Sequence, residues 1–155
     1  MTDLTARLEP IATLEILLGE ATLAGAMELG TRRVSQIVGG SMTGDGLNGT
    51  ILPGGSDWQL IRSDGVTEFA ARYLVRLDTG VHLSVRNQGY RHGPAEVMAA
   101  LGRGETVDPS LYYFGSTLVI EAPAGPLAWL NATQIVANGA REGGRVRKAA
   151  FALRR

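Results

Sequence analysis

Two side chains in this sequence have types suited to proton transfer, the carboxyl of Asp57 and the hydroxyl of Tyr113. Asp57 closes a glycine-rich stretch at residues 39–57, and Tyr113 is the centre of the aromatic triplet 112–114. A carboxylate becomes an effective general base only where its surroundings perturb its pKa, and a sequence does not display those surroundings. Other roles stay open: Asp57 could pair with an arginine, and the triplet could be a lid or a cluster that seals one end of the fold.

Polar and aromatic side chains also recur among the apolar residues of the expected strands. Tyr73 and Asn87 share the alternation of the apolar residues of one hairpin, and Trp129 and Asn131 lie on one face of another expected strand. A buried Asn or Tyr without partners costs about 1–3 kcal/mol. Such groups therefore either satisfy one another or contact a ligand. With Trp58 as a further aromatic wall, the second interpretation is a small-molecule pocket with few polar contacts.

Arg72 and Arg91 are candidate contacts for an anion. Arg72 falls on the polar face of its expected strand, so a solvated exterior is its default position; if that face lined a wet lumen, it could hold a carboxylate or enolate through two hydrogen bonds. Arg91 follows Asn87 by four residues, where a strand would leave the sheet, and could stand at the mouth of a pocket. Fourteen of the fifteen basic residues are arginine. A GC-rich genome explains that bias most simply, and bidentate anion binding is the alternative.

Residue types typical of metal and cofactor sites are scarce. The chain has no cysteine and two histidines, His82 and His92, without a cluster of carboxylates that would complete a zinc site. Residues 44–49 read G-x-G-x-x-G, but the β-branched residues and proline at 50–53 exclude the helix that a dinucleotide fingerprint requires. No nucleophile elbow occurs either. The sequence therefore predicts no metal and no cofactor.

Composition narrows the class of protein further. Fifteen acidic residues balance fifteen basic residues, so a nucleic-acid partner is not expected. No apolar run reaches the roughly 18 residues of a membrane span, and the first ten residues lack the pattern of a signal peptide. With no cysteine, these features predict a soluble cytoplasmic protein. Its expected partner is a small-molecule ligand, and a homodimer stays open.

The elements that would position these residues are mostly short strands. A period of two is clearest in a hairpin at 69–85, where apolar residues alternate with charged ones around the turn 78–80. Residues 94–103 have the apolar spacing and the N-terminal proline of one short helix. Further strands are expected at 13–18, with a bulge at Gly19, and at 31–38, 49–52, 58–62, 117–121, 128–138 and 146–153.

Eight to ten strands without a βαβ rhythm predict an all-β fold. An antiparallel barrel or sandwich closes such strands without exposed edges, and we favour a single antiparallel β-barrel. The length of 155 residues fits one domain. Residues 1–155 are therefore expected to form one β-barrel domain, in which residues 1–10 are an N-terminal arm.

Several motifs follow one another in a recognisable order. They are Gly39-Gly40, Leu52-Pro53-Gly54-Gly55-Ser56-Asp57-Trp58-Gln59, Ala71-Arg72-Tyr73, Asn87-Gln88-Gly89-Tyr90-Arg91, Tyr112-Tyr113-Phe114 and Trp129-Leu130-Asn131. Together they resemble a bacterial and fungal family called domain of unknown function 3237, or uncharacterised protein family 0311. The resemblance extends from about residue 8 to residue 153.

The resemblance implies a small β-barrel similar to calycin-like or cyclase-like barrels. It implies no particular activity, because most members have none assigned. The sequence departs from the family pattern at Ala70, where an acidic residue usually precedes Ala-Arg-Tyr, and at Gly115, where an arginine usually follows Tyr-Phe. Both departures remove charge from the expected site, so chemistry assigned through those charges would not carry over.

These observations predict a barrel that binds an apolar or aromatic small molecule bearing a carbonyl or carboxylate. The expected walls are Trp58, Tyr73, Tyr113 and Trp129, the polar contacts are Asn87, Asn131, Arg72 and Arg91, and the proton-transfer group is Asp57 or Tyr113. A cofactor-free isomerase, cyclase or lyase is one interpretation. The other is a non-catalytic carrier, or a structural or oligomerisation module whose motif residues only close the barrel. An enzyme would have a pocket with a titratable group of shifted pKa, a carrier a pocket without one, and a structural protein a filled lumen.

Overall fold

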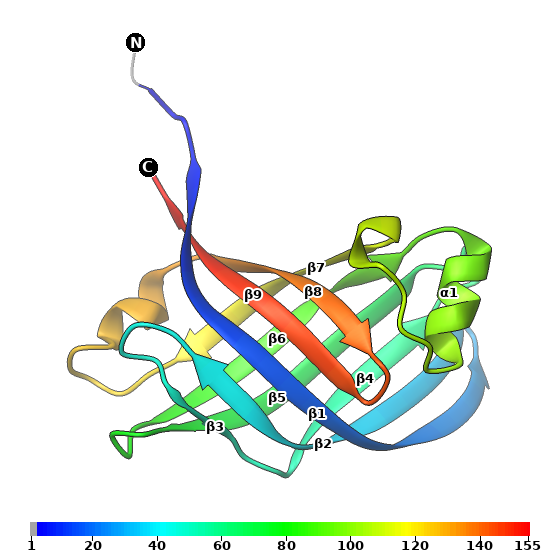
Figure 1. Ribbon diagram of the computed structural model, residues 1–155, viewed down its shortest axis with the longest axis horizontal. Helices are drawn as coiled ribbons and strands as arrows, with labels where there is room; N and C mark the ends of the chain where they lie inside the picture. The colour runs from blue at the N-terminus through cyan, green and yellow to red at the C-terminus, as the bar shows by residue number, and fades with distance from the viewer. Residues whose placement is uncertain (1–2) are drawn as a thin grey trace.

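The computed structural model describes residues 3–155, which form a nine-stranded antiparallel sheet closed into a barrel (Figure 1). The strands are β1 (Arg7–Met27), β2 (Gly30–Thr43), β3 (Gly49–Ile51), β4 (Gly55–Ile61), β5 (Thr67–Leu77), β6 (His82–His92), β7 (Tyr113–Glu121), β8 (Ile135–Glu142) and β9 (Arg145–Arg154). Their order around the ring is β1-β9-β8-β7-β6-β5, and β3 and β4 then each bridge β5 to β2. Pairing of β2 with β1 completes the circle, which confirms the predicted all-β antiparallel barrel.

Three helical segments lie at the two ends of the barrel. The predicted short helix is confirmed as α1 (Ala95–Gly102), which begins directly after Pro94 and buries Leu101. A 3₁₀ helix, η1 (Pro109–Leu111), follows it near the same end. The second 3₁₀ helix, η2 (Ala128–Ala132), lies at the opposite end, in gold in Figure 1.

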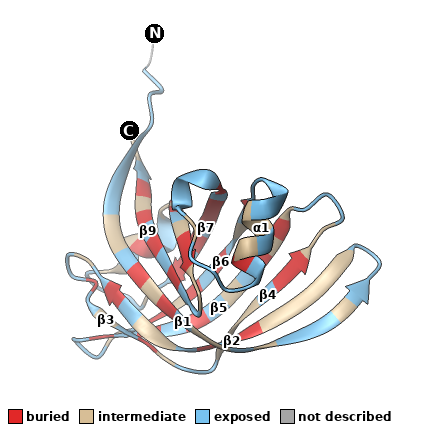
Figure 2. Cartoon of the chain, turned by 45° about the vertical axis from the view of Figure 1, so that its right-hand side comes forward, coloured by how far each residue is buried: buried red, intermediate tan, exposed pale blue. Residues whose placement is uncertain are grey.

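Strand parity decides which side chains enter the lumen. Buried and exposed residues alternate along the strands, as Figure 2 shows. The expected hairpin is confirmed as β5 and β6, where Phe69, Tyr73 and Val85 point inward while Arg72 is exposed. The buried apolar residues form one core inside the barrel, extended by residues of η2 and α1.

Close approach of β1 and β2 requires a glycine. Gly40 of β2 has φ 138° and faces Ile16 of β1, and a Cβ at this position would overlap the carbonyl oxygen of Glu15. The predicted bulge at Gly19 is also present, since the register between β1 and β2 shifts between Leu18 and Ala21. Both features let these long strands bend around the barrel.

The segment 128–138 differs from its prediction. Residues 128–132 are helical and β8 begins only at Ile135, because Gly125, with φ 130°, turns the chain and accepts the hydrogen bond that opens η2. The expected arm also overlaps a strand, since Arg7–Pro10 already pair with residues 151–154 of β9. Residues 1 and 2 of that arm lie outside the described residues. None of the helices within residues 3–155 has the length and apolar character needed to cross a membrane.

Candidate functional site

A cluster of buried polar side chains occupies the barrel interior. Its seven members come from five strands: Asp57 and Gln59 on β4, Tyr73 on β5, Asn87 and Arg91 on β6, Arg141 on β8 and Lys148 on β9. We call these residues the interior cluster. Six of them, all except Tyr73, line one cavity together with apolar residues of β1, β2, β5, β7 and β9. The cluster is therefore a polar centre enclosed by apolar walls, as small-molecule sites commonly are.

Lys148 is the only lysine of the chain, and it is 3 % exposed. Its Nζ lies 4.3 Å from the ring centroid of Phe114 and 4.8 Å from that of Phe69. The same nitrogen donates a hydrogen bond to Ser116 Oγ at 3.3 Å. The amine is thus enclosed by two aromatic rings and one hydroxyl.

The surroundings of Lys148 favour the neutral amine. Burial lowers the pKa of Lys148 to about 7, with a further contribution from the guanidinium of Arg91, while the Asp57 carboxylate acts in the opposite direction. The amine and the ammonium are consequently both populated at neutral pH. A lysine in this state can donate a proton, accept one or act as a nucleophile.

Arg91 and Arg141 are both only 5 % exposed. The Arg91 guanidinium carbon lies 5.3 Å from the ring centroid of Phe114. Burial lowers the pKa of Arg91 to about 10, and the neighbouring Arg141 adds to the effect. Burial and Arg33 similarly lower the pKa of Arg141. The Nε atoms of both arginines are buried without a hydrogen-bond partner among the described residues, so these guanidiniums keep unused donors in the interior.

Asp57 is the carboxylate of the cluster. Its Oδ2 accepts a hydrogen bond from Gln59 Nε2 at 2.9 Å, while its Oδ1 is buried without a partner. Burial raises the pKa of Asp57, although the hydrogen bond from Gln59 and the charges of Arg91, Lys148 and Arg141 oppose the shift. Within residues 3–155, the ion pairs involve partly exposed side chains and none includes Asp57 or the three buried cations.

The charge balance of the interior cluster favours binding of an anionic ligand. Two guanidiniums, together with Lys148 in its ammonium form, face one carboxylate, and uncompensated buried charge costs several kcal/mol per ion. The free volume of the cavity is about 20 Å³, which holds about one water-sized group. Any larger ligand must therefore displace side chains that line the cavity.

Four of the residues expected in a site meet in this cluster: Asp57, Tyr73, Asn87 and Arg91. Burial raises the pKa of Tyr73, and the Asp57 charge raises it further. Within residues 3–155, the Tyr73 hydroxyl and Asn87 Oδ1 have no hydrogen-bond partner. Arg91 is still within β6, rather than at a point where the strand has left the sheet.

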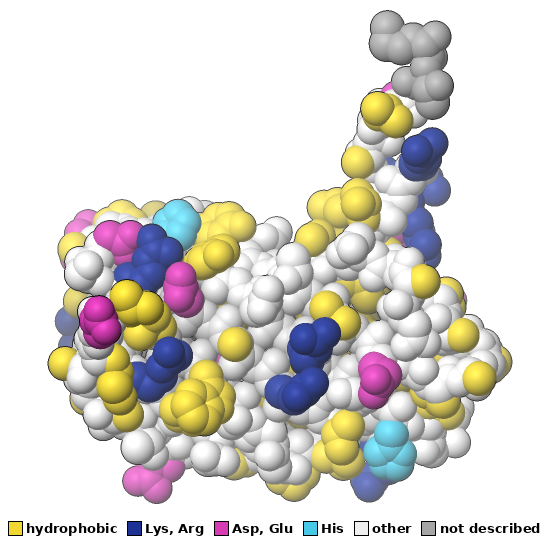
Figure 3. Space-filling model, turned by 180° about the vertical axis from the view of Figure 1, so that it is seen from behind, with side chains coloured by type: hydrophobic (Ala, Val, Ile, Leu, Met, Phe, Trp, Pro, Cys, Tyr) yellow, Lys and Arg dark blue, Asp and Glu magenta, His cyan; other side chains and the backbone are white. Residues whose placement is uncertain are grey.

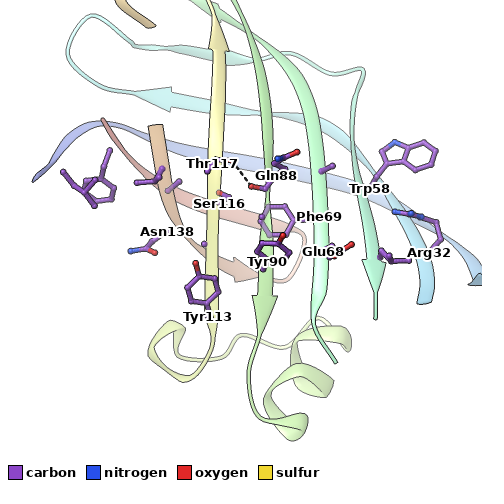
Figure 4. A pocket seen from close by; sticks show the side chains of 18 residues that line it. Arg32, Trp58, Glu68, Phe69, Gln88, Tyr90, Tyr113, Ser116, Thr117 and Asn138 are labelled. Carbon is purple, nitrogen blue, oxygen red and sulfur yellow. Dashed lines mark hydrogen bonds between the residues drawn. The ribbon is translucent and has the colours of Figure 1, made fainter. Parts of the chain in front are cut away.

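Trp58 and Tyr113 lie elsewhere, in a broad groove on the outer wall of the barrel (Figure 4). This outer groove, with a volume of about 780 Å³, is lined by Trp58, Tyr90, Tyr113, Gln88, Asn138 and their neighbours. Trp58 and Tyr113 are each 52 % exposed. Trp58 Nε1 donates to Ser56 Oγ at 3.1 Å, and Tyr113 stacks on His92 with 4.9 Å between ring centroids. The Tyr113 hydroxyl therefore does not share the cavity of Asp57.

Arg72 takes the exterior position that was its default. Figure 3 shows one face of this exterior, where charged and apolar side chains are interspersed and form no single large patch. Asn131 and Trp129 belong to η2, beyond the interior cluster. Asn131 accepts from the Ala122 N–H at 2.9 Å and donates to the carbonyls of Ala122 at 3.0 Å and Ala128 at 3.2 Å. Its amide is fully engaged in holding η2 against the end of β7.

Lys148, Arg141 and Gln59 were not among the expected site residues. Lys148 shares its parity with Val146 and Ala150 in a strand that was predicted, so its inward direction could have been read from the sequence. Arg141 lies beyond residue 138, where that strand was expected to end, and this hid its parity. The described residues contain no group of three side chains suited to hold a metal ion.

Comparison with known proteins places the chain among sequences without an assigned activity. The family model described as "Protein of unknown function (DUF3237)" matches residues 6–153. A UPF0311 protein of Rhodopseudomonas palustris is 37% identical over 136 residues, which cover 88% of this chain and 89% of that protein. A UPF0311 protein of Clostridium acetobutylicum is 36% identical over 123 residues, covering 79% of this chain and 78% of that protein.

Solved structures share the barrel. The conserved protein of unknown function from Rhodopseudomonas palustris superimposes with a TM-score of 0.94 at 34% identity, over 97% of this chain and 99% of that chain. A structure from Acinetobacter baumannii, described as a beta-barrel like protein, has a TM-score of 0.86 at 35% identity and 99% coverage of both chains. An enzyme from Penicillium herquei has a TM-score of 0.71 at 14% identity, over 97% of this chain and 98% of that chain, a likeness of fold alone.

Proposed function

Since the chain belongs to the DUF3237 family, whose function is unknown, we propose from the interior cluster that it binds a small carbonyl- or carboxylate-bearing molecule in its barrel and moves a proton on it. The observation that carries the proposal is one cavity lined by both Asp57 and Lys148, whose pKa values are shifted towards neutrality from opposite sides. Pairs of titratable groups with shifted pKa values mark acid–base sites.

The arrangement suits removal of a proton from the carbon next to a carbonyl. Asp57 Oδ1, which has no partner, is the atom available to accept that proton. The negative charge then develops on the carbonyl oxygen, where Lys148 in its ammonium form and Arg91 are positioned to stabilise it. Return of the proton at another atom gives isomerisation, and attack or departure of a neighbouring group gives cyclisation or elimination. None of these steps requires a metal or an organic cofactor.

A non-catalytic carrier or structural role is the second candidate, and the small free volume favours the structural role. At about 20 Å³ the cavity is nearly filled by the protein's own side chains. A structural role would require the polar groups to satisfy one another, yet Asp57 Oδ1, Tyr73 Oη and Asn87 Oδ1 do not. A structural role would therefore need partners for these atoms other than the described side chains.

The test is hydrogen–deuterium exchange at carbon, followed by NMR in D₂O. The probes are 2-oxobutanoate, acetoacetate, levulinate and phenylpyruvate, each of which has an exchangeable proton beside a carbonyl. The wild-type protein is expected to accelerate exchange of at least one probe about 100-fold over buffer. The variant Asp57→Asn should lose this acceleration, and the exposed control Asp45→Asn should keep it.

Two outcomes would overturn the acid–base function. One is no acceleration with any of the four probes, and the other is equal acceleration by Asp57→Asn. Saturable thermal stabilisation by a probe without exchange would support the carrier instead. Neither stabilisation nor exchange would support the structural role.

A further inference from the structure

The lone lysine of the chain is buried with an aromatic wall beside its amine. The other fourteen basic residues are all arginines. Five of these arginines form surface ion pairs and are partly exposed, at positions 62, 103, 145, 147 and 154. A lysine is therefore used only at the interior position 148. Arginine cannot lose its proton in a protein, whereas a buried lysine can, and only the neutral amine is a nucleophile.

The contacts of Lys148 give its ammonium two cation–π rings, Phe69 and Phe114, but no acidic partner among the described residues. Nζ has the Ser116 hydroxyl as its hydrogen-bond partner, at 3.3 Å, and forms no ion pair among the described residues. Asp57 and Arg91 line the same cavity as the amine. The amine thus faces the lumen with a proton donor and an unpaired cation nearby.

We propose that Lys148 forms a covalent imine with the carbonyl carbon of an anionic oxo acid, whose carboxylate is held by Arg91 and Arg141. This inference rests on the proposed function, because it names the substrate class and the covalent step of the same site. The two guanidiniums supply the donors for a carboxylate, including the unpartnered Nε atoms. The neighbouring amine then meets a carbonyl of the same small molecule.

The step balances without any further reactant. The lone pair of neutral Lys148 Nζ attacks the carbonyl carbon, and a C–N bond forms. The carbonyl C–O bond then breaks, and its oxygen leaves as water with the two protons of the amine. Protonated Asp57 gives its proton to the imine nitrogen, which becomes an iminium ion, and the resulting Asp57 carboxylate is the base for the adjacent carbon. Burial raises the pKa of Asp57, which makes its carboxylate a better acceptor for the proton that the Lys148 ammonium gives up before the attack and that Asp57 then returns to the imine nitrogen.

Reductive trapping tests the imine. Native protein is incubated with levulinate and sodium cyanoborohydride, and peptides are mapped by mass spectrometry. Since Lys148 is the only lysine, an adduct on its peptide is unambiguous, and mapping separates it from an adduct on the N-terminal amine. Trapping at Lys148 should be on the order of 10–100-fold faster in native protein than in the same protein denatured in urea. The exposed-site variant Arg72→Met should trap at the wild-type rate.

The anion preference is measured with 2-pentanone, which has the ketone of levulinate without its carboxylate. Levulinate should be trapped about tenfold faster than 2-pentanone in wild-type protein, and Arg91→Met should bring the ratio close to one. Lys148→Arg keeps a positive charge without a primary amine and should show no adduct at this position.

Trapping at Lys148 that is no faster in native than in denatured protein would overturn the imine. The exchange experiment separates the two failures. Exchange by the wild type without trapping would refute the imine and leave the proton-transfer function standing, whereas loss of both would refute both. Equal trapping of levulinate and 2-pentanone would refute the carboxylate contact.

Discussion

The interior cluster and the outer groove both combine aromatic, amide and charged side chains, but their polar groups have different surroundings. In the outer groove, the indole of Trp58 has a serine partner and the half-exposed Tyr113 stacks on His92. In the interior cluster, Asp57 and Arg91 each retain a buried atom without a partner, and burial shifts both of their pKa values. The comparison shows that the reactivity of a side chain here depends on its removal from water rather than on the motif to which it belongs.

Neighbouring residues of one motif fall on opposite sides of this divide. Asp57 enters the lumen while Trp58 faces the outer groove, and Phe114 enters while Tyr113 faces out. Because side chains alternate along a strand, a shift of register by one residue would exchange their environments. The pairing of β6 with β7 and of β4 with β5 therefore decides which half of each motif can meet a ligand in the barrel.

The largest expected contrast is between two adjacent residues of β7. Phe114→Ala removes a buried ring that contacts Phe69 and both Lys148 and Arg91, and it should lower the free energy of unfolding by about 3–5 kcal/mol. Tyr113→Ala removes a half-exposed ring and should lower it by about 1 kcal/mol or less. Urea denaturation measures both. Equal losses would contradict the register of β7 and with it the division into two regions.

Much of this division could be predicted from the sequence where a strand has a clean period of two. In the hairpin 69–85, the alternation of apolar and polar residues predicted that Tyr73 points inward, and the same alternation predicted this for Asn87. The same rule also gives the inward direction of Lys148, but a charged residue is almost never fully buried, so that residue was not counted as a site residue; Arg141 lay beyond the predicted end of its strand. Whether a barrel leaves room for them depends on strand number and stagger, which are properties of the closed ring and of no single segment.

Trp129 and Asn131 were assigned to the wrong element for a different reason. Trp129 and Asn131 were expected on one strand face, but the turn at Gly125 leads into a 3₁₀ helix. In that helix the Asn131 amide reaches back to Ala122 of the preceding segment. A contact of this kind depends on a local turn that alternation of residue types does not encode.

Lys148→Met should raise the stability of the ligand-free protein by about 1–3 kcal/mol at pH 7, because it replaces a buried amine with an apolar side chain of similar volume. Arg72→Met, on the exterior, should change it by about 0.5 kcal/mol or less. The measurement is urea denaturation of both variants. A loss of stability in Lys148→Met would contradict an uncompensated charge in the interior cluster.

The pH dependence sharpens the same prediction. The pKa of Lys148 is about 7 in the folded protein and 10.5 in the unfolded chain, so between these values the unfolded chain binds more protons. The stability of the wild type should therefore rise with pH across this window, and below pH 7 the cost of the buried ammonium is present in full. Asp57 and Arg91, which face Lys148, remain in Lys148→Met, so the difference between the two proteins isolates the lysine. A constant difference from pH 6 to 10 would contradict the lowered pKa.

The smallest expected change in stability is a loss, opposite in sign to the gain expected for Lys148→Met. Asn131→Leu also replaces a polar side chain by an apolar one of similar size, but Asn131 has partners for both its amide oxygen and its amide nitrogen. Loss of these exposed hydrogen bonds should lower the free energy of unfolding by about 1 kcal/mol, a fall of about 2–4 °C in Tm for a chain of this size. The control Asn138→Leu, at an exposed position of the outer groove, should change Tm by less than that. Lys148→Met is expected to raise stability, because Lys148 lacks an acidic partner among the described residues. If Asn131→Leu also raised Tm, then hydrogen-bond satisfaction would not distinguish structural polar residues from those that serve a ligand.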